Sequence, residues 1–448
     1  MAQLRLLRSV GLFSLTALAI NGMVGSGIFV LPAQVAGILG PASLFAYLIA
    51  GGATGLIVLC FAEVGARFDR SGGPYLYARA AFGDWIGFEI GWMLLIARIT
   101  AVGAISNAFA SYLGLFSPAL AAGNGRVAVI TVSIAGLAAV NFYGVRYGTW
   151  VNDLFTIAKL APLLLFVGAG VFSIDLQRFH GWMVLEGSGL RQASLLLIFA
   201  FGGFEFAAVP GEEVVNPKRN LPVALMTAMS FVTVLYLLIQ LVAQGTLADL
   251  ASSATPLASA GRLFLGPVGG ILLTAGAVLS TTGTNSGTLL TAPRIVYAMA
   301  EGGQLPSLFA RVHKSYRTPH FAIAITASLG LVCALSSRFA LLAAVSAIAR
   351  LLCYMSTCLA LPVLRRKIPV APGAFSVPGK ATIPVIALAL STWLLLGSTR
   401  AQTIISAAAL LAGAMIYSCY RRFRGEDQST GAEYADAGAA AIRASSNE

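Results

Sequence analysis

Two short glycine-rich stretches interrupt long apolar runs and offer groups that could bind a small zwitterion. They read GMVGSGIF at 22–29 and FAFGGFE at 199–205. A helix that breaks inside a membrane leaves backbone N–H and C=O groups without partners, which is tolerated only where they line a cavity or meet a ligand. Free N–H groups suit a carboxylate, and free carbonyls suit an ammonium. One α-amino acid carries both charges, so the two breaks predict an amino-acid site.

The first break has a second interpretation. Gly25, Ser26 and Gly27 are small, and small residues also let membrane helices approach closely. Residue type alone does not separate close packing from ligand binding. The second interruption favours a site, because interrupted helices at matching positions in two halves of a chain mark the site of an inverted-repeat transporter.

Charged side chains within the apolar runs are the next candidates. Lys159 lies in the middle of VNDLFTIAKLAPLLLFV. Burial disfavours a charged ammonium, so Lys159 could load and release a proton during transport. The alternative is a permanently charged strut that joins helices, and uncoupled exchange would fit that strut equally well.

Arg98, Glu205 and Arg350 are also in or beside apolar runs. Arg98 has no accessible neutral form and must find a carboxylate, carbonyls or water; it belongs either to a side-chain pocket or to the structural framework. Glu205 is either a sensor or gate, or one end of a hydrogen bond between helices. Arg350 has no assignment beyond pairing with an acidic residue near the cytoplasmic side.

The elements that position these residues follow from composition. The chain of 448 residues is 58% hydrophobic and 10% charged, which excludes a soluble globular protein. Apolar runs of the length needed to cross a bilayer as a helix recur along the chain. The twelve predicted spans are 11–36, 41–66, 86–113, 126–142, 149–173, 191–209, 222–244, 267–298, 320–337, 340–363, 381–398 and 402–420. The fold class is therefore an all-α, polytopic membrane protein.

Charge distribution predicts the orientation of the spans. Of the 29 Lys and Arg residues, twenty fall in segments on the same side as the two termini. These include Arg5, Arg8, Arg70, Arg146 and the cluster at 365–367. The positive-inside rule then places both termini in the cytoplasm. The net charge of +12 is explained by topology and requires no nucleic-acid partner.

Other kinds of site find no support. The five cysteines lie inside apolar runs without metal-ligand spacing, and the three histidines fall between spans or, for His320, at the first residue of one. We therefore predict no metal, cofactor, disulfide framework or enzyme active site. The first 36 residues are too apolar and too closely followed by a second run to be a cleaved signal peptide. The segment 421–448 is predicted to be a cytoplasmic tail, disordered after about residue 425.

Four motifs resemble the amino acid–polyamine–organocation superfamily of transporters. They are NGMVGSGIFVLP, EVGARFDRSGGPYLYARAAFG, FAFGGFEFAAVPGEEVVNPKRNLPVAL and TAPRIVYAMAEGGQLP. The resemblance implies a cytoplasmic N-terminus at 1–10 and a transmembrane domain at 11–420. Within it, residues 11–173 and 191–363 would form two inverted five-helix repeats, with breaks in helices 1 and 6. Helices 11 and 12 would span 381–420.

The resemblance also implies roles for individual residues. The backbone amides around Gly25, Ser26 and Gly27, with the Ser26 hydroxyl, would take a substrate carboxylate. Carbonyls would take the ammonium, from Met23, Phe199 and Gly202, with Ala200 beside them and Phe199 as an aromatic gate. Lys159 would bridge carbonyls near Gly22 and a hydroxyl of the eighth span, with Thr284 as first choice and Ser280 as second. The loop cluster Glu212, Glu213, Lys218 and Arg219 is either a solvated hinge or a gating contact.

The sequence therefore predicts a secondary active transporter, with proton-coupled import of a neutral L-amino acid as the first hypothesis. An amino acid or amine antiporter and a non-transporting amino acid sensor are the alternatives. The expected partners are an amino acid, a proton and the lipid bilayer, and the expected location is a bacterial inner membrane. Neither the particular substrate nor the oligomeric state follows from the sequence.

Overall fold

The computed structural model describes residues 10–68, 73–143, 149–180, 187–208, 214–369 and 375–424. Helices dominate this part of the chain, which contains no strand and only an isolated bridge between Val10 and Val214. The helices are α1 (Leu12–Met23), α2 (Ser26–Leu39), α3 (Ser43–Gly65), α4 (Gly73–Phe82), α5 (Asp84–Leu113), α6 (Gly123–Tyr143), α7 (Thr149–Gly170), α8 (Gly187–Phe201), α9 (Pro217–Thr246), α10 (Pro256–Glu301), α11 (His320–Ser336), α12 (Phe339–Lys367), α13 (Thr382–Leu395) and α14 (Arg400–Arg424). Short 3₁₀ helices join them, of which η5 (Phe204–Ala208) is part of the site.

The helices confirm a polytopic membrane protein. Within the described residues, nine helical stretches are long and apolar enough to cross a bilayer. Three further apolar helices, α1, α11 and α13, are shorter. Each of the twelve apolar runs contains a helix. The number of membrane spans stays a prediction, because only the nine stretches are long and apolar enough by themselves to cross a bilayer.

Both predicted interruptions are breaks in the backbone. Helix α1 ends at Met23, and α2 begins at Ser26 after the non-helical residues Val24 and Gly25. Helix α8 ends at Phe201, and η5 starts at Phe204. Between them, Gly203 has φ of +114°, a conformation that side chains other than glycine rarely adopt. Glycine at position 203 is therefore needed for this turn.

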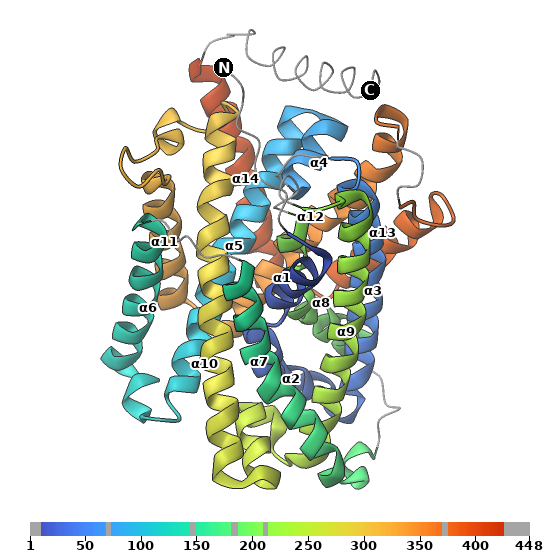
Figure 1. The fold of residues 1–448 in the computed structure, drawn as a ribbon, viewed down its shortest axis with the longest axis vertical. Coiled ribbons are helices and arrows are strands. Elements are labelled where there is room, and N and C mark those ends of the chain that lie inside the picture. Colours follow the sequence, from blue (N-terminus) through green and yellow to red (C-terminus); the bar gives the residue numbers. More distant parts are fainter. Residues whose placement is uncertain are drawn as a thin grey trace.

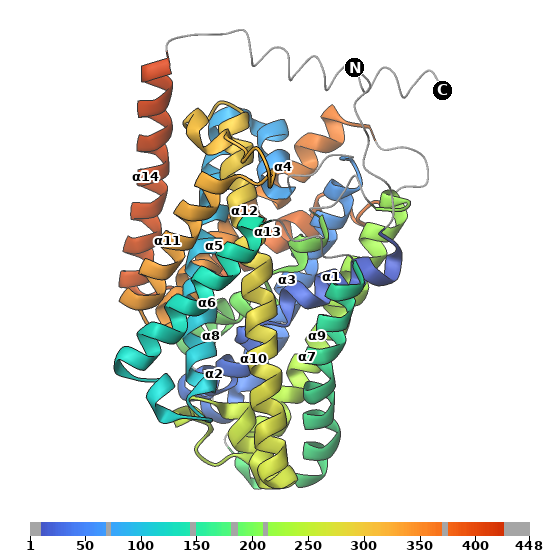
Figure 2. The same cartoon turned by 60° about the vertical axis from the view of Figure 1, so that its left-hand side comes forward.

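The two helix breaks lie inside the helix bundle. Figures 1 and 2 show α8 within the bundle and α6, α11 and α14 at its outside, and α1 runs from the exposed Phe13 at the surface to the buried Met23 at the break. Helix α8 packs against α2, α3 and α12, and α1 packs against α7, α9 and η5. The main hydrophobic core runs through both breaks, from Met23 and Val24 to Phe201 and Phe204. The breaks are thus covered by protein on all sides, as unpaired backbone groups in a membrane require.

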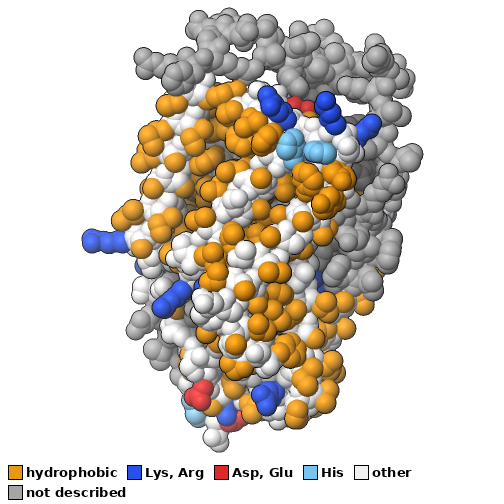
Figure 3. Space-filling view, turned by 90° about the vertical axis from the view of Figure 1, so that its left-hand side faces the viewer, with side chains coloured by type: hydrophobic (Ala, Val, Ile, Leu, Met, Phe, Trp, Pro, Cys, Tyr) orange, Lys and Arg blue, Asp and Glu red, His pale blue; other side chains and the backbone are white. Residues whose placement is uncertain are grey.

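The outer surface matches a lipid environment. Figure 3 shows hydrophobic side chains across the middle of one face, with acidic side chains near its two ends. Large apolar side chains are exposed, including Val132 at 71% and Phe172 at 90%. Such extensive exposed apolar surface is unfavourable in water and favourable in hydrocarbon.

Several predictions concern residues outside the described ranges. These are the N-terminal segment 1–9, Arg70, Arg146, Glu212, Glu213 and the tail from 425. Lys218 and Arg219, the described half of the predicted loop cluster, are both exposed.

Candidate functional site

The two helix breaks face each other. A Cβ atom on Gly22 would contact Phe206 at 2.7 Å, and it would overlap the carbonyl oxygen of Gly203. A Cβ atom on Gly27 would lie 2.8 Å from the Ala200 Cα atom. Glycine at 22 and 27 therefore permits close approach of the two backbones, as the packing interpretation requires. These glycines alone do not identify a ligand site, so the polar groups around them must decide.

Ser26 carries the clearest polar group without a partner. Its side chain is 1% exposed, and its hydroxyl makes no hydrogen bond within the described residues. Ser26 begins α2, where Gly25 is the N-cap residue and provides no side-chain cap. The first N–H groups of a helix have no partners inside it and form its positive end. A buried hydroxyl beside such N–H groups is a site that a carboxylate would satisfy.

The carbonyls at the breaks are partly occupied by a tyrosine. The Tyr236 hydroxyl of α9 donates to the Met23 carbonyl at 2.8 Å and approaches the Ala200 carbonyl at 3.3 Å. The Gly25 N–H also donates to Met23, at 2.9 Å. Both lone pairs of the Met23 carbonyl oxygen are therefore occupied in this arrangement. The sequence alone does not single out Tyr236, because the chain has 13 tyrosines and Tyr236 lies in an ordinary apolar run.

Phe199 lies at the edge of the second break. Its side chain is 7% exposed and packs edge-on against Phe339 of α12, with ring centroids 5.7 Å apart. Gly202 follows one turn later, and a Cβ atom there would lie 2.7 Å from the Arg350 Nη1 atom. Phe199 and Phe339 together cover this side of the broken helix.

Lys159 of α7 is fully buried and joins three helices. Its ammonium donates to the carbonyls of Asn21 at 3.1 Å and Val24 at 2.8 Å, and to the Thr284 hydroxyl at 3.3 Å. Ser280 donates to the same Val24 carbonyl at 3.0 Å. We call Lys159, its three partners and Ser280 the lysine site. Thr284 and Ser280 are the two hydroxyl residues predicted for this position, and the carbonyls flank Gly22.

The electrostatics of the lysine site are unusual. No carboxylate pairs with Lys159 among the described residues. Three acceptors match the three N–H groups of a protonated ammonium, so the charge is stabilised by dipoles alone. Loss of the proton would leave no unpaired charge behind.

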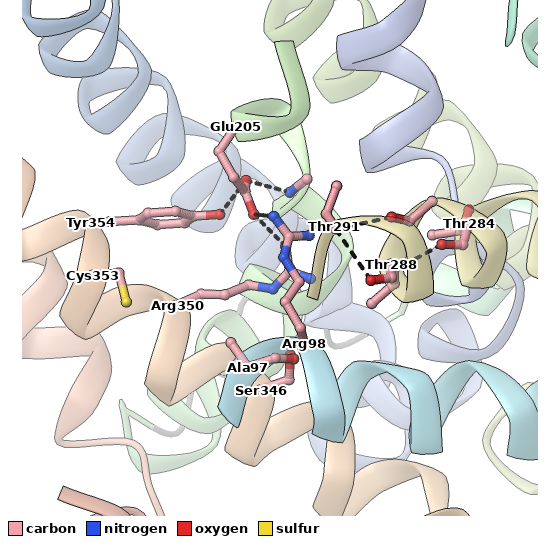
Figure 4. Close-up of polar contacts among 12 residues, drawn as sticks. Ala97, Arg98, Glu205, Thr284, Thr288, Thr291, Ser346, Arg350, Cys353 and Tyr354 are labelled. Atoms are coloured by element: carbon pink, nitrogen blue, oxygen red, sulfur yellow. Dashed lines mark hydrogen bonds and ion pairs between the residues drawn. The ribbon is translucent and has the colours of Figure 1, made fainter. Parts of the chain in front are cut away.

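Glu205 forms a second buried charge cluster, shown in Figure 4. Its Oε1 atom accepts from Arg98 of α5 and Arg350 of α12, both at 3.0 Å. Its Oε2 atom accepts from the Tyr354 hydroxyl and the Gly203 N–H, both at 2.8 Å. We call Arg98, Glu205, Arg350 and Tyr354 the arginine–glutamate cluster. It ties the second break to α5 and α12, and it gives Arg350 a partner that the sequence did not identify.

The arginine–glutamate cluster contains two guanidinium groups and one carboxylate. Arg98 lies over the Phe206 ring at 4.3 Å, a cation–π contact. Its Nε and Nη1 atoms are buried without hydrogen-bond partners in the described structure, as is the Nε atom of Arg350. Arg98 therefore takes part in both the framework and a cationic region beside the second break.

A third group of buried charges is centred on Glu63 of α3. Glu63 is fully buried and pairs with Arg67 and with Arg365 of α12, both at 2.6 Å. The Val377 N–H donates to the same carboxylate at 2.7 Å. These contacts join α3 to α12 and to the segment that follows it.

A family model described as amino acid permease matches residues 10–419. The chain belongs to the amino acid permease family. As a member it is a membrane transporter and not an enzyme.

Three relatives show the range of substrates within the family. All three are from Bacillus subtilis (strain 168). A serine/threonine exchanger is 31% identical, covering 88% of this chain and 91% of its own. A branched-chain amino acid permease is 30% identical, covering 93% of each chain. A methylthioribose transporter is 28% identical, covering 93% of this chain and 94% of its own. The family match supports amino acid transport and leaves the particular substrate open.

Proposed function

We propose that this permease is a secondary active transporter that imports a neutral L-amino acid together with a proton, by alternating access around the two facing breaks. The observation that carries the proposal is the buried hydroxyl of Ser26, which has no partner within the described residues and lies at the uncapped start of α2. A second broken helix faces it through Gly27 and Ala200. Burying a polar group without a partner is costly, and a bound substrate would remove that cost.

In this proposal the zwitterion binds across both breaks. Its carboxylate takes the Ser26 hydroxyl and the N–H groups of Ser26 and Gly27 at the positive end of α2. Its ammonium takes the carbonyls of Met23, Phe199 and Gly202. Because Tyr236 already donates to Met23, the Tyr236 hydroxyl must move aside or share that carbonyl when substrate binds. Phe199 acts as the gate.

Lys159 provides the proton coupling in this proposal. The ammonium has no charged partner among the described residues, and it contacts the α1–α2 break directly through Asn21 and Val24. Loss of its proton would remove a donor from those carbonyls and change how α7 holds the break. The strut interpretation stays open, since all three N–H groups have acceptors.

The arginine–glutamate cluster is proposed to act as the gate on the other side of the site. Glu205 moves with the second break, whereas Arg98 and Arg350 belong to α5 and α12. Opening a path beside the break would separate these charges. An acidic substrate side chain would compete with Glu205 for Arg98 and Arg350. We therefore propose that the substrate has a neutral side chain.

The architecture proposed for the transporter has twelve spans. Residues 11–173 and 191–363 form two inverted repeats, which would relate the α1–α2 break to the α8–η5 break by pseudo-symmetry. The remaining spans lie at 381–420, both termini are cytoplasmic, and the membrane is a bacterial inner membrane. The central position of both breaks supports this arrangement.

The experiment that tests the proposal is uptake into proteoliposomes of purified protein. Tritiated L-serine, L-threonine and L-leucine are tested with and without an inward proton gradient, in vesicles without internal amino acid. We expect accumulation of at least one substrate above its external concentration, dependent on the gradient. If no amino acid enters under any condition, the transport proposal is wrong.

An exchanger is the second candidate, because the serine/threonine exchanger is among the similar proteins. The same vesicles distinguish the two. Uptake that appears only after the vesicles are preloaded with an amino acid, and that ignores the proton gradient, would identify an obligate exchanger. Lys159 would then be a structural strut.

A further inference from the structure

A polar cavity of about 450 Å³ lies between α5, α6 and the segment that joins α11 to α12. Its lining includes Asn107, Ser111, Arg126, Ser337, Arg338 and Phe339. Asn107 and Ser111 lie near the C-terminal end of α5, opposite the end that follows α4. The cavity volume is in the range that accommodates small ligands.

The wall of the cavity is built by hydrogen bonds between three elements. Arg126 donates to the Asn107 side-chain oxygen and, at 3.1 Å, to the Ala334 carbonyl. The Asn107 amide nitrogen donates to the carbonyls of Gly103 at 3.0 Å and of Ala334 and Ser337 at 3.2 Å. Asn107 therefore fixes the position of the Arg126 guanidinium at the cavity.

The charge of the cavity is positive. Its lining contains two arginines and no carboxylate. Neither Arg126 nor Arg338 forms an ion pair within the described part of the chain. In addition, α12 begins at Phe339 with no side-chain cap and no acidic residue in its first turn. Two guanidinium groups beside the positive end of a 29-residue helix favour a carboxylate.

The cavity adjoins the candidate substrate site. Phe339 lines the cavity, and its ring packs against Phe199 at 5.7 Å between centroids. Phe199 lies just before the Gly202–Gly203 turn of the second break. The Phe199–Phe339 pair therefore lies between the cavity and the second break.

We propose that this cavity is a separate entry site, in which Arg126 and Arg338 hold the α-carboxylate of an amino acid before it passes the Phe199–Phe339 pair. The inference rests on the proposed function, because it assumes that an amino acid is transported. It adds a carboxylate-binding site on one side of the membrane only, the side opposite the predicted cytoplasmic termini.

Arg338→Gln is the informative variant. Arg338 is exposed and directly precedes α12, so its side chain can be neutralised without breaking the contacts of Arg126. Arg338→Lys keeps the charge, and Arg262→Gln removes an exposed arginine that does not line the cavity. Initial uptake of tritiated L-threonine and L-leucine is measured in right-side-out and inside-out membrane vesicles, which expose opposite faces. L-threoninamide, which lacks the carboxylate, serves as a competitor.

We expect Arg338→Gln to raise the half-saturating concentration about five-fold in right-side-out vesicles only, as loss of one charge-assisted contact predicts. Arg338→Lys should restore most of the difference, and Arg262→Gln should behave as wild type. The preference for L-threonine over L-threoninamide as competitor should fall in Arg338→Gln.

Three results would overturn the inference while leaving transport intact. The first is a half-saturating concentration that Arg338→Gln leaves unchanged. The second is an equal rise of that concentration in right-side-out and inside-out vesicles. The third is an equal loss of competition by L-threonine and by L-threoninamide. Absence of uptake by the wild-type protein would instead reject the proposed function.

Discussion

The lysine site and the arginine–glutamate cluster stabilise the two helix breaks in opposite ways. At the first break, the Lys159 charge is held by carbonyls and one hydroxyl, with no charged partner among the described residues. At the second break, Glu205 is held by two arginines, a tyrosine and a backbone N–H. Both groups are buried, with exposed fractions of 0% for Lys159 and 2% for Glu205.

This difference determines what each charge can do. A proton can leave Lys159 without leaving an opposite charge unpaired, so the lysine site suits a change of protonation during transport. Removing the charge of Glu205 would leave two buried guanidinium groups unpaired, so the arginine–glutamate cluster suits a contact that is kept whole or opened as a unit. The comparison predicts that neutral substitutions will affect stability at one break and coupling at the other.

The largest expected effect is on stability, from Glu205→Gln. Breaking a buried ion pair from one side costs about 3–5 kcal/mol, because the remaining charge stays buried. We expect the midpoint of thermal unfolding in detergent to fall strongly, with little protein reaching the folded state. The double variant Glu205→Gln/Arg350→Met removes one of the two stranded charges and should recover part of that loss. Equal stability of Glu205→Gln and wild type would contradict the comparison.

The next effect is on coupling, from Lys159→Met. The side chain keeps its length and loses its charge, and the Val24 carbonyl keeps Ser280 as a donor. We therefore expect a smaller loss of stability than for Glu205→Gln, about 1.5–3 kcal/mol, because hydrogen bonds of a charged group are lost and no charge is left unpaired. Accumulation driven by a proton gradient should disappear, while preloaded vesicles continue to exchange internal for external amino acid. Gradient-driven accumulation at the wild-type level would identify Lys159 as a strut.

The sequence predicts the first region better than the second, for a physical reason. The breaks and Lys159 are visible because glycine pairs and a lone charge contradict the apolar runs around them. The partners of Lys159 could be anticipated only through family resemblance. The partner of Arg350 could not, since Glu205 lies 145 residues earlier and only the packing of α12 against the second break brings them together.

The same limit applies to groups that look ordinary in sequence. Tyr236 is a tyrosine in an apolar run until the fold directs its hydroxyl at the Met23 carbonyl. The close approach of Gly27 to Ala200 also depends on the fold. Any larger residue at position 27 would disturb packing as well as ligand binding, so it cannot separate the two interpretations of the first break.

Ser26→Ala separates them, with a smaller expected effect. It removes the hydroxyl that has no partner within the described residues, so stability without substrate should not fall. We expect the half-saturating concentration for transport to rise about ten-fold or more, the equivalent of one hydrogen bond to a charged group. Ser194→Ala is the matched control, because its hydroxyl is also buried without a partner and lies in α8 before Phe199. Equal effects of both changes would favour the packing interpretation.

The smallest effect concerns the residue that connects the two breaks. Tyr236→Phe frees the carbonyls of Met23 and Ala200. Without substrate, the protein should lose about 1 kcal/mol of stability, as for one buried hydrogen bond. With substrate, the half-saturating concentration should fall about two- to five-fold, because the ammonium no longer competes with the hydroxyl for Met23. Tyr112→Phe is the control, since its buried hydroxyl donates at 2.7 Å to the carbonyl of Phe29, which lies inside α2 and is not one of the proposed ammonium acceptors. It should lose stability with no change in affinity. Weaker substrate binding by Tyr236→Phe would show that the hydroxyl contacts the substrate itself, and the ammonium acceptors would then have to be sought at Phe199 and Gly202 alone.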